Sequence, residues 1–152
     1  MIEGRIDFIR FLVAAKSATY AGSGCESAPS RPASHDLCYV EGEYKYIDTY
    51  LGGIEFIGEE AVWRSGVPLW GMNYYGYMLV PEAPEGFSRF LKESLKLVPS
   101  EAPYRGPETY QEGDFEYRCA WKGVLEYFTG REEIWWKGEE IFALDFHGGE
   151  IK

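Results

Sequence analysis

The sequence predicts an α+β protein in which a bent antiparallel β-sheet, built from meanders, carries two α-helices packed on one face. Apolar residues recur at helical spacing near the start and again in the middle of the chain, whereas short β-prone segments follow each of these stretches. The β-prone segments are joined by short, glycine-containing turns, which permit only antiparallel pairing. With 152 residues, 45% of them hydrophobic, we expect a single domain over residues 1–152.

The first predicted helix spans residues 6–18, with apolar side chains at Ile6, Ile9, Leu12, Val13 and Ala15. A segment rich in glycine, serine and proline follows over residues 19–34 and cannot sustain a helix or a strand. Long loops inside small domains are often functional. We therefore expect this segment to cover a site.

The remaining elements are short strands and one more helix. Strands are predicted over residues 37–41, 44–50, 54–57, 61–64 and 67–75, and then over 115–121, 124–128, 133–136 and 141–147. Between the two series lies a helix over residues 84–98, which ends at Pro99, and a proline-rich connector over 99–107. The two halves share the same order of elements, but no repeat at the level of residues is expected.

The composition argues against several classes of function. A formal net charge of −10 and a pI near 4.7 disfavour direct binding of nucleic acid, which depends on lysine and arginine. No apolar run approaches the roughly 20 residues of a membrane span, and no secretion signal is visible, so we expect a cytoplasmic protein that does not contact membranes. The three cysteines lack metal-binding or disulfide spacing, and neither a metal nor a cofactor is predicted.

Aromatic residues, 17% of the chain, give the strongest indication of a site. Strand alternation places Tyr46, Asp48 and Tyr50 on one face, which is a row of phenol rings with a carboxylate in it. Such rings beside polar groups are typical of small-molecule pockets.

The densest aromatic run covers residues 70–77. Alternation places Trp70 and Tyr74 on one face of this strand and Asn73 and Tyr75 on the other, so only one set can line a given cavity. Core packing explains the first set equally well.

Titratable residues supply further candidates. His35 and Asp36 follow the long loop and form either a base held by a carboxylate or a loop cap, and His147 lies beside two glycines. Arg105 is either an anchor for an anionic ligand group or part of a structural salt bridge.

Glu59 and Glu60 lie next to Trp63. The pair is interpreted either as carboxylates for acid and base chemistry or a divalent cation, or as a solvated turn, and the turn is favoured because charged residues are usually exposed.

Taken together, these segments resemble an uncharacterised prokaryotic domain family that occurs alone or C-terminal to XRE-type helix-turn-helix modules. The resemblance covers nearly the whole chain and rests on Thr19-Tyr20-Ala21-Gly22, Ser30-Arg31-Pro32 with His35-Asp36, Tyr46-Ile47-Asp48-Thr49-Tyr50-Leu51-Gly52-Gly53, Phe56-Ile57-Gly58-Glu59-Glu60-Ala61-Val62-Trp63, Trp70-Gly71-Met72-Asn73-Tyr74-Tyr75-Gly76, Pro103-Tyr104-Arg105-Gly106-Pro107 and Phe146-His147-Gly148-Gly149. It implies a domain of unknown function and supplies no catalytic residues. A helix-turn-helix pattern is not seen at the front of this sequence, so DNA contact is not implied for it.

The leading hypothesis is a binding or sensing domain with an aromatic, acidic pocket for a small polar or cationic ligand. The candidate ligand contacts are His35, Asp36, Tyr46, Asp48, Tyr50, Glu59, Trp63, Trp70, Asn73, Tyr74, Tyr75, Arg105 and His147. One alternative is a hydrolase that uses His35 or the Glu59 and Glu60 pair as acid or base. Another is a protein-interaction module with an exposed Trp135 or Trp136, and a homo-oligomer is compatible with either.

Overall fold

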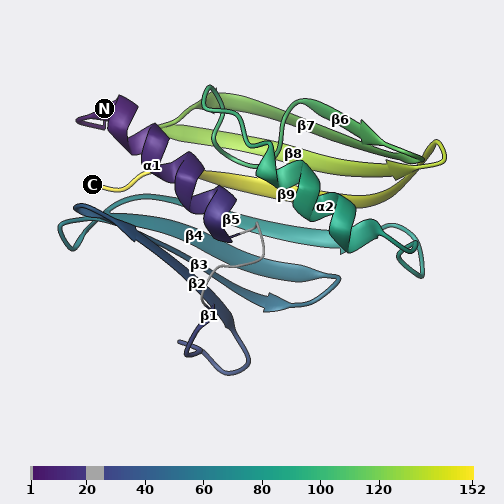
Figure 1. The fold of residues 1–152 in the computed structure, drawn as a ribbon, viewed down its shortest axis with the longest axis horizontal. Helices are drawn as coiled ribbons and strands as arrows, with labels where there is room; N and C mark the ends of the chain where they lie inside the picture. The colour runs from purple at the N-terminus through teal and green to yellow at the C-terminus, as the bar shows by residue number, and fades with distance from the viewer. Residues whose placement is uncertain (1, 20–25) are drawn as a thin grey trace.

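The computed structural model describes residues 2–19 and 26–152, which form two helices and nine strands in one open sheet (Figure 1). The first half contains α1 (Arg5–Ala18), β1 (Glu26–Ser27), β2 (His35–Glu41), β3 (Tyr44–Gly52), β4 (Phe56–Arg64) and β5 (Val67–Met78). The second half contains α2 (Phe87–Lys96), β6 (Thr109–Glu112), β7 (Phe115–Val124), β8 (Tyr127–Trp136) and β9 (Glu139–Glu150). Residues 20–25 of the expected cover lie outside the described residues.

The strand order is β1-β2-β3-β4-β5-β9-β8-β7-β6, and every pairing is antiparallel. Both helices lie on the same face of the sheet, and the two halves of the sheet diverge from the central pair β5 and β9 (Figure 1). The predicted α+β class and the helices on one face are therefore confirmed.

Each helix packs through one apolar stripe. In α1 the buried residues are Phe8, Phe11, Leu12, Ala15 and Lys16, whereas Ile6, placed in the stripe by the sequence, is 84% exposed. In α2 the buried residues are Phe87, Phe90, Leu91, Ser94 and Leu95. The stripe of α1 thus includes a buried lysine that the hydrophobic pattern did not indicate.

Two expected turns are instead the middles of strands. Gly58-Glu59-Glu60 lies within β4, paired on both sides with β3 and β5, and Gly130-Arg131 lies within β8. The prediction of a solvated turn at Glu59 and Glu60 is wrong, because pairing with a strand on each side keeps this polar segment extended. As a result Glu60 points toward the helices and Glu59 points away from them.

The expectation that the halves share no repeat at the level of residues is also wrong. Gly42 and Gly113 both have φ 60°, Gly52 and Gly123 both have φ 99°, and Gly66 and Gly138 both have φ 82°. β4 and β8 carry register shifts at corresponding places, after Val62 and after Ile134. Each half contains one copy of a unit made of a helix and four strands, α1 with β2–β5 and α2 with β6–β9, and β1 lies outside the repeat.

Side-chain contacts repeat as well. Arg10 of α1 pairs with Glu41 of β2 at 3.3 Å, and Arg89 of α2 pairs with Glu112 of β6 at 2.6 Å. Tyr39 and Tyr110 each donate a hydrogen bond of 2.9 Å to the glutamate two residues further on. Phe11 stacks on Tyr44 and Phe90 stacks on Phe115, both with ring centroids 5.0 Å apart.

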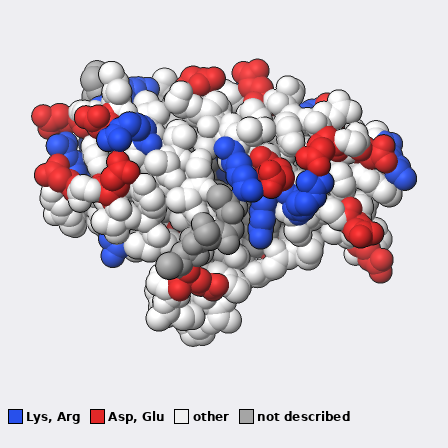
Figure 2. All heavy atoms as spheres, viewed as in Figure 1, with Lys and Arg blue, Asp and Glu red and all other residues white. Residues whose placement is uncertain are grey.

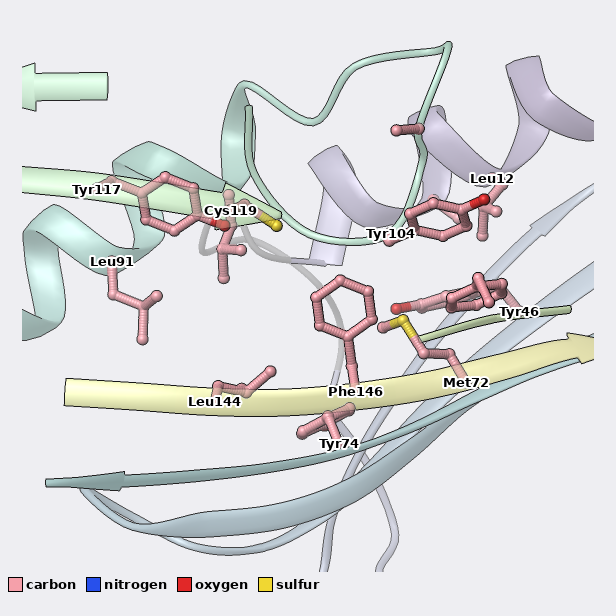
Figure 3. Close-up of a cluster of buried hydrophobic side chains, with 14 of the residues drawn as sticks. Leu12, Tyr46, Met72, Tyr74, Leu91, Tyr104, Tyr117, Cys119, Leu144 and Phe146 are labelled. Carbon is pink, nitrogen blue, oxygen red and sulfur yellow. The ribbon is translucent and has the colours of Figure 1, made fainter. Parts of the chain in front are cut away.

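The two copies meet at the β5 and β9 pair, where Tyr74 lies directly opposite its counterpart Phe146. An approximate two-fold axis therefore crosses the sheet at this pair. Figure 3 shows the layer above it, in which Phe146 points toward Tyr104 in the connection between α2 and β6. This layer between sheet and helices forms the core.

Two glycines allow rings to lie flat against the sheet, and this gives a first prediction. A Cβ atom at Gly130 would overlap the ring of Phe146, just as one at Gly58 would overlap the ring of Tyr74. We expect Gly130→Ala to lower the free energy of unfolding by about 1–3 kcal/mol through overpacking, measured by urea denaturation. Gly53→Ala is the control, since a Cβ there meets nothing within 4 Å, and equal effects of the two substitutions would contradict the role of Gly130.

Candidate functional site

The core contains a cluster of buried charged and phenolic side chains on the helix side of the sheet. Lys16, Asp48, Glu60, Arg105 and Glu132 are each at most 2% exposed. Charged residues are rarely buried to this degree unless they are paired. We call these five residues, with Tyr74 and Tyr117, the buried polar cluster.

Lys16 links α1 to the sheet. Its Nζ forms an ion pair with Glu60 of β4 and donates a hydrogen bond of 2.6 Å to the backbone carbonyl of Tyr104. Burial lowers the pKa of Lys16, and the nearby Glu60 opposes that change.

Asp48 lies directly across from Glu60 on the neighbouring strand. Burial, followed by the charge of Glu60, raises the pKa of Asp48 to about 7. The hydroxyl of Tyr74 donates a hydrogen bond of 2.5 Å to Asp48 Oδ1. Among residues 2–19 and 26–152, no basic side chain forms an ion pair with Asp48.

Arg105 forms a two-point ion pair with Glu132, in which Nε and Nη2 each donate a hydrogen bond of 3.0 Å. Tyr117 donates a bond of 2.6 Å to the same carboxylate, and the Tyr117 oxygen accepts one of 2.8 Å from the amide of Gly106. Burial, with the adjacent charge of Glu132, holds the pKa of Tyr117 well above its usual range. Of the two roles expected for Arg105, the structure shows the structural salt bridge.

A cavity of about 350 Å³ opens beside Asp48, and we call it the inner pocket. Its floor carries Asp48, Tyr74 and Arg105, and its rim carries Glu26 and Lys92. The walls are mainly apolar and aromatic side chains from the sheet, the turn between β3 and β4, and α2: Leu37, Tyr50, Ile54, Phe56, Phe87, Leu91 and Leu95. An apolar hollow with a few converging polar groups is the usual form of a small-molecule site.

Comparison of the two copies of the repeat shows which residues of the buried polar cluster are common to both copies and which are found in only one. Tyr46 and Glu60 of the first copy correspond to Tyr117 and Glu132 of the second, so a tyrosine and a glutamate belong to both units. By contrast, Asp48 corresponds to Cys119, Tyr74 to Phe146 and Lys16 to Leu95. The second copy therefore forms the same scaffold without the Asp48 carboxylate and the Tyr74 hydroxyl, which face the inner pocket in the first copy.

A second, larger hollow of about 1080 Å³ lies on the opposite face of the sheet, and we call it the outer groove. Glu59, Asn73 and His147 lie side by side across β4, β5 and β9, and Thr129 and Lys122 continue the row on β8 and β7. Tyr75 lines the groove in the adjacent row and is 46% exposed.

The candidate residues from the sequence therefore divide between the two faces. Asp48, Tyr50, Tyr74 and Arg105 line the inner pocket. Glu59, Asn73, Tyr75 and His147 line the outer groove. A single pocket that contains all of them is excluded, because the sheet separates the two sets.

Tyr46 and Trp70 are fully buried and line neither hollow. The indole nitrogen of Trp70 donates a hydrogen bond of 3.1 Å to the carbonyl of Leu125, and its ring stacks on Phe128. Both residues are therefore part of the core rather than of either hollow. Trp63 lies half-buried at the register shift of β4 and lines neither hollow.

His35 and Asp36 do not act as a pair. Asp36 accepts hydrogen bonds from the amide of Ser30 at 3.1 Å and the hydroxyl of Ser34 at 2.8 Å. Burial alone would raise the pKa of Asp36, but these hydrogen bonds outweigh it and lower the pKa. The carboxylate thus caps the loop, whereas His35 contacts Glu26 at 2.8 Å and stacks on Tyr50.

The residues suggested for hydrolysis do not combine into one site. Glu59 and Glu60 face opposite sides of the sheet and cannot act on one substrate together. Burial raises the pKa of Cys119 to about 12, so this thiol is not an activated nucleophile. Within the described part of the chain, no group of three or more His, Cys, Asp and Glu side chains is arranged to hold a metal ion.

Trp135 and Trp136 are both half-buried rather than freely exposed. Arg118 lies over the ring of Trp135 and Lys137 over that of Trp136, each 4.5 Å from the ring centroid. On the face that carries the helices, acidic and basic side chains are intermixed (Figure 2). None of the described helices is long and apolar enough to cross a membrane.

These features define an α+β protein whose duplicated unit of one helix and four strands encloses a buried polar cluster and a pocket. A family model described as a domain of unknown function, DUF5680, matches residues 48–151, and the chain belongs to this family. No curated protein and no solved structure matches the chain. The matched region contains the inner pocket's Asp48, Tyr74 and Arg105 as well as the whole outer groove except Arg31.

Proposed function

We propose that the protein binds a small, largely apolar molecule with a basic nitrogen in the inner pocket. Asp48 carries this proposal, because it is a carboxylate 1% exposed, at the floor of a cavity, with no ion-pair partner among the described residues. The volume of about 350 Å³ suits a ligand at the small end of the usual range.

The charges of the buried polar cluster favour a cation. Glu60 is matched by Lys16 and Glu132 by Arg105, so ionised Asp48 leaves one negative charge in excess. A ligand ammonium group would neutralise that charge and lower the pKa of Asp48. The rings of Tyr50, Phe56 and Tyr74 add favourable contacts with a cation, each about 0.5–2 kcal/mol.

The internal repeat supports a functional origin for Asp48 and Tyr74. A carboxylate and a phenol at these places are not required by the scaffold, since Cys119 and Phe146 occupy them in the second copy. Buried polar groups that a fold does not need are expected mainly at functional sites.

Binding is testable by thermal shift with a panel of aliphatic and aromatic amines, polyamines, nucleosides and sugars. We expect an amine to raise the midpoint of unfolding, and Asp48→Asn to weaken its binding at least tenfold by calorimetry. Tyr74→Phe should weaken it by roughly tenfold, because one hydrogen bond to a charged group is lost. Binding should strengthen as the pH rises through about 7, where Asp48 ionises.

Glu59→Gln is the matched control, because this carboxylate is one residue from Glu60 but faces the outer groove. The Glu59→Gln variant should bind the same amine with unchanged affinity. Equal affinities in the wild type and in Asp48→Asn would refute the proposal.

We propose that this binding serves a sensory role. Related domains that follow XRE-type helix-turn-helix modules would, on this proposal, report ligand occupancy to the attached DNA-binding part. The pocket lies between α2 and the sheet, so a bound ligand would contact both and stabilise the packing of α2 against the sheet.

A further inference from the structure

We infer that the outer groove is a second, independent binding site and that its ligand is a short, neutral carbohydrate chain. The groove is separated from the inner pocket by the sheet and shares only Tyr74 with it among the lining residues. Its volume of about 1080 Å³ is several times that of the inner pocket's 350 Å³.

Hydrogen-bonding groups form a continuous row across the groove. Glu59 pairs in register with Asn73, Asn73 with His147, His147 with Thr129, and Thr129 with Lys122. Neighbouring strands lie about 4.8 Å apart, so these five groups span roughly 19 Å. A ligand that meets them all must be elongated and must offer a donor or acceptor at each strand.

The charges of the groove do not select an ion. Glu59 and Asp145 are acidic, whereas Arg31, Lys122 and Arg131 are basic. Arg131 forms ion pairs with three carboxylates, Glu133 at 3.2 Å, Glu140 at 3.1 Å and Asp145 at 3.4 Å, so the basic groups are not in net excess. Nucleic acid or another polyanion requires such an excess. Charges of both signs in near balance favour a neutral, polar ligand.

An exposed ring provides the remaining part of a carbohydrate site. Tyr75 stacks on Tyr77 with centroids 5.6 Å apart, and both belong to the face that carries the groove. Held in this way, the Tyr75 ring offers a rigid apolar surface to the C–H face of a sugar, while Asn73 and His147 beside it bind hydroxyl groups.

The test is affinity electrophoresis through gels that contain neutral polysaccharides, such as glucans, mannans, xylans and galactans. We expect at least one of them to retard the protein, and Asn73→Ala and Tyr75→Ala to weaken retardation at least tenfold. Tyr75→Phe should keep most of the effect, because the ring surface remains. Raising the salt concentration should change little, since the ligand is neutral.

Asp48→Asn separates this site from the inner pocket, because it should weaken amine binding at least tenfold and leave retardation unchanged. The inference is overturned if no neutral polysaccharide retards the folded wild-type protein. It is equally overturned if retardation persists in both alanine variants, or if it disappears at high salt as binding to a charged contaminant would. Each of these three results leaves the proposal for the inner pocket untouched.

Discussion

Replacing Lys16 by leucine is expected to lower the free energy of unfolding by about 3–5 kcal/mol at neutral pH. The substitution leaves Glu60, which is 0% exposed, without the cation that neutralises it. Leucine suits the packing, because Leu95 occupies the corresponding place in the stripe of α2. Guanidinium denaturation followed by tryptophan fluorescence measures the change.

Two companion variants identify the cause. Lys96→Leu removes an exposed ion pair with Glu93 and should cost less than about 1 kcal/mol. The double variant Lys16→Leu, Glu60→Gln should recover much of the loss, because neither charge of the pair is then left in the core without the other. If Lys16→Leu were as mild as Lys96→Leu, the ion pair would not be an important part of the core.

Much of the fold followed from local pattern. Helical spacing and glycine turns were sufficient to predict both helices, the meanders and the antiparallel pairing, since each depends on neighbouring residues. Strand alternation also predicted correctly that Asp48 shares a face with Tyr46 and Tyr50, and that Asn73 and Tyr75 face away from Tyr74. The central pairing of β5 with β9 could not be predicted from local sequence patterns, because it joins segments far apart in the chain.

The buried polar cluster was only partly predictable. Asp48, Tyr74 and Arg105 were candidates, but Lys16, Glu132 and Tyr117 were missed because charged residues on amphipathic elements are normally assigned to the surface. Lys16 meets Glu60 only after α1 folds across the sheet.

One overlooked signal could have identified Glu60 and Glu132 together. The spacing Gly-x-Glu-x-x-Trp-x-x-Gly occurs at residues 58–66 and again at 130–138. Because it falls in β4 and β8, it marks the internal repeat and its two buried glutamates.

Asp48→Asn is expected to make the protein more stable than the wild type above pH 7, by about 2–4 kcal/mol. The pKa of Asp48 is about 7 in the folded protein and near 4 when unfolded. Between these values the folded state holds a proton that the unfolded state has lost, so the contribution of Asp48 to stability falls as the pH rises from about 4 to 7. Asparagine does not titrate, and its carbonyl can still accept the hydrogen bond from Tyr74.

The measurement is the difference in unfolding free energy between variant and wild type at several pH values from 4.5 to 8.5, which cancels the titration of groups that do not interact with Asp48. The difference should be small at the acid end and grow until about pH 7, whereas Glu59→Gln, exposed on the other face, should show no such trend. A difference that stays constant with pH would mean that Asp48 titrates normally. A carboxylate that weakens the fold near neutral pH, at a place where the second copy has Cys119, is retained for binding rather than for stability, because function is the usual reason for such a cost.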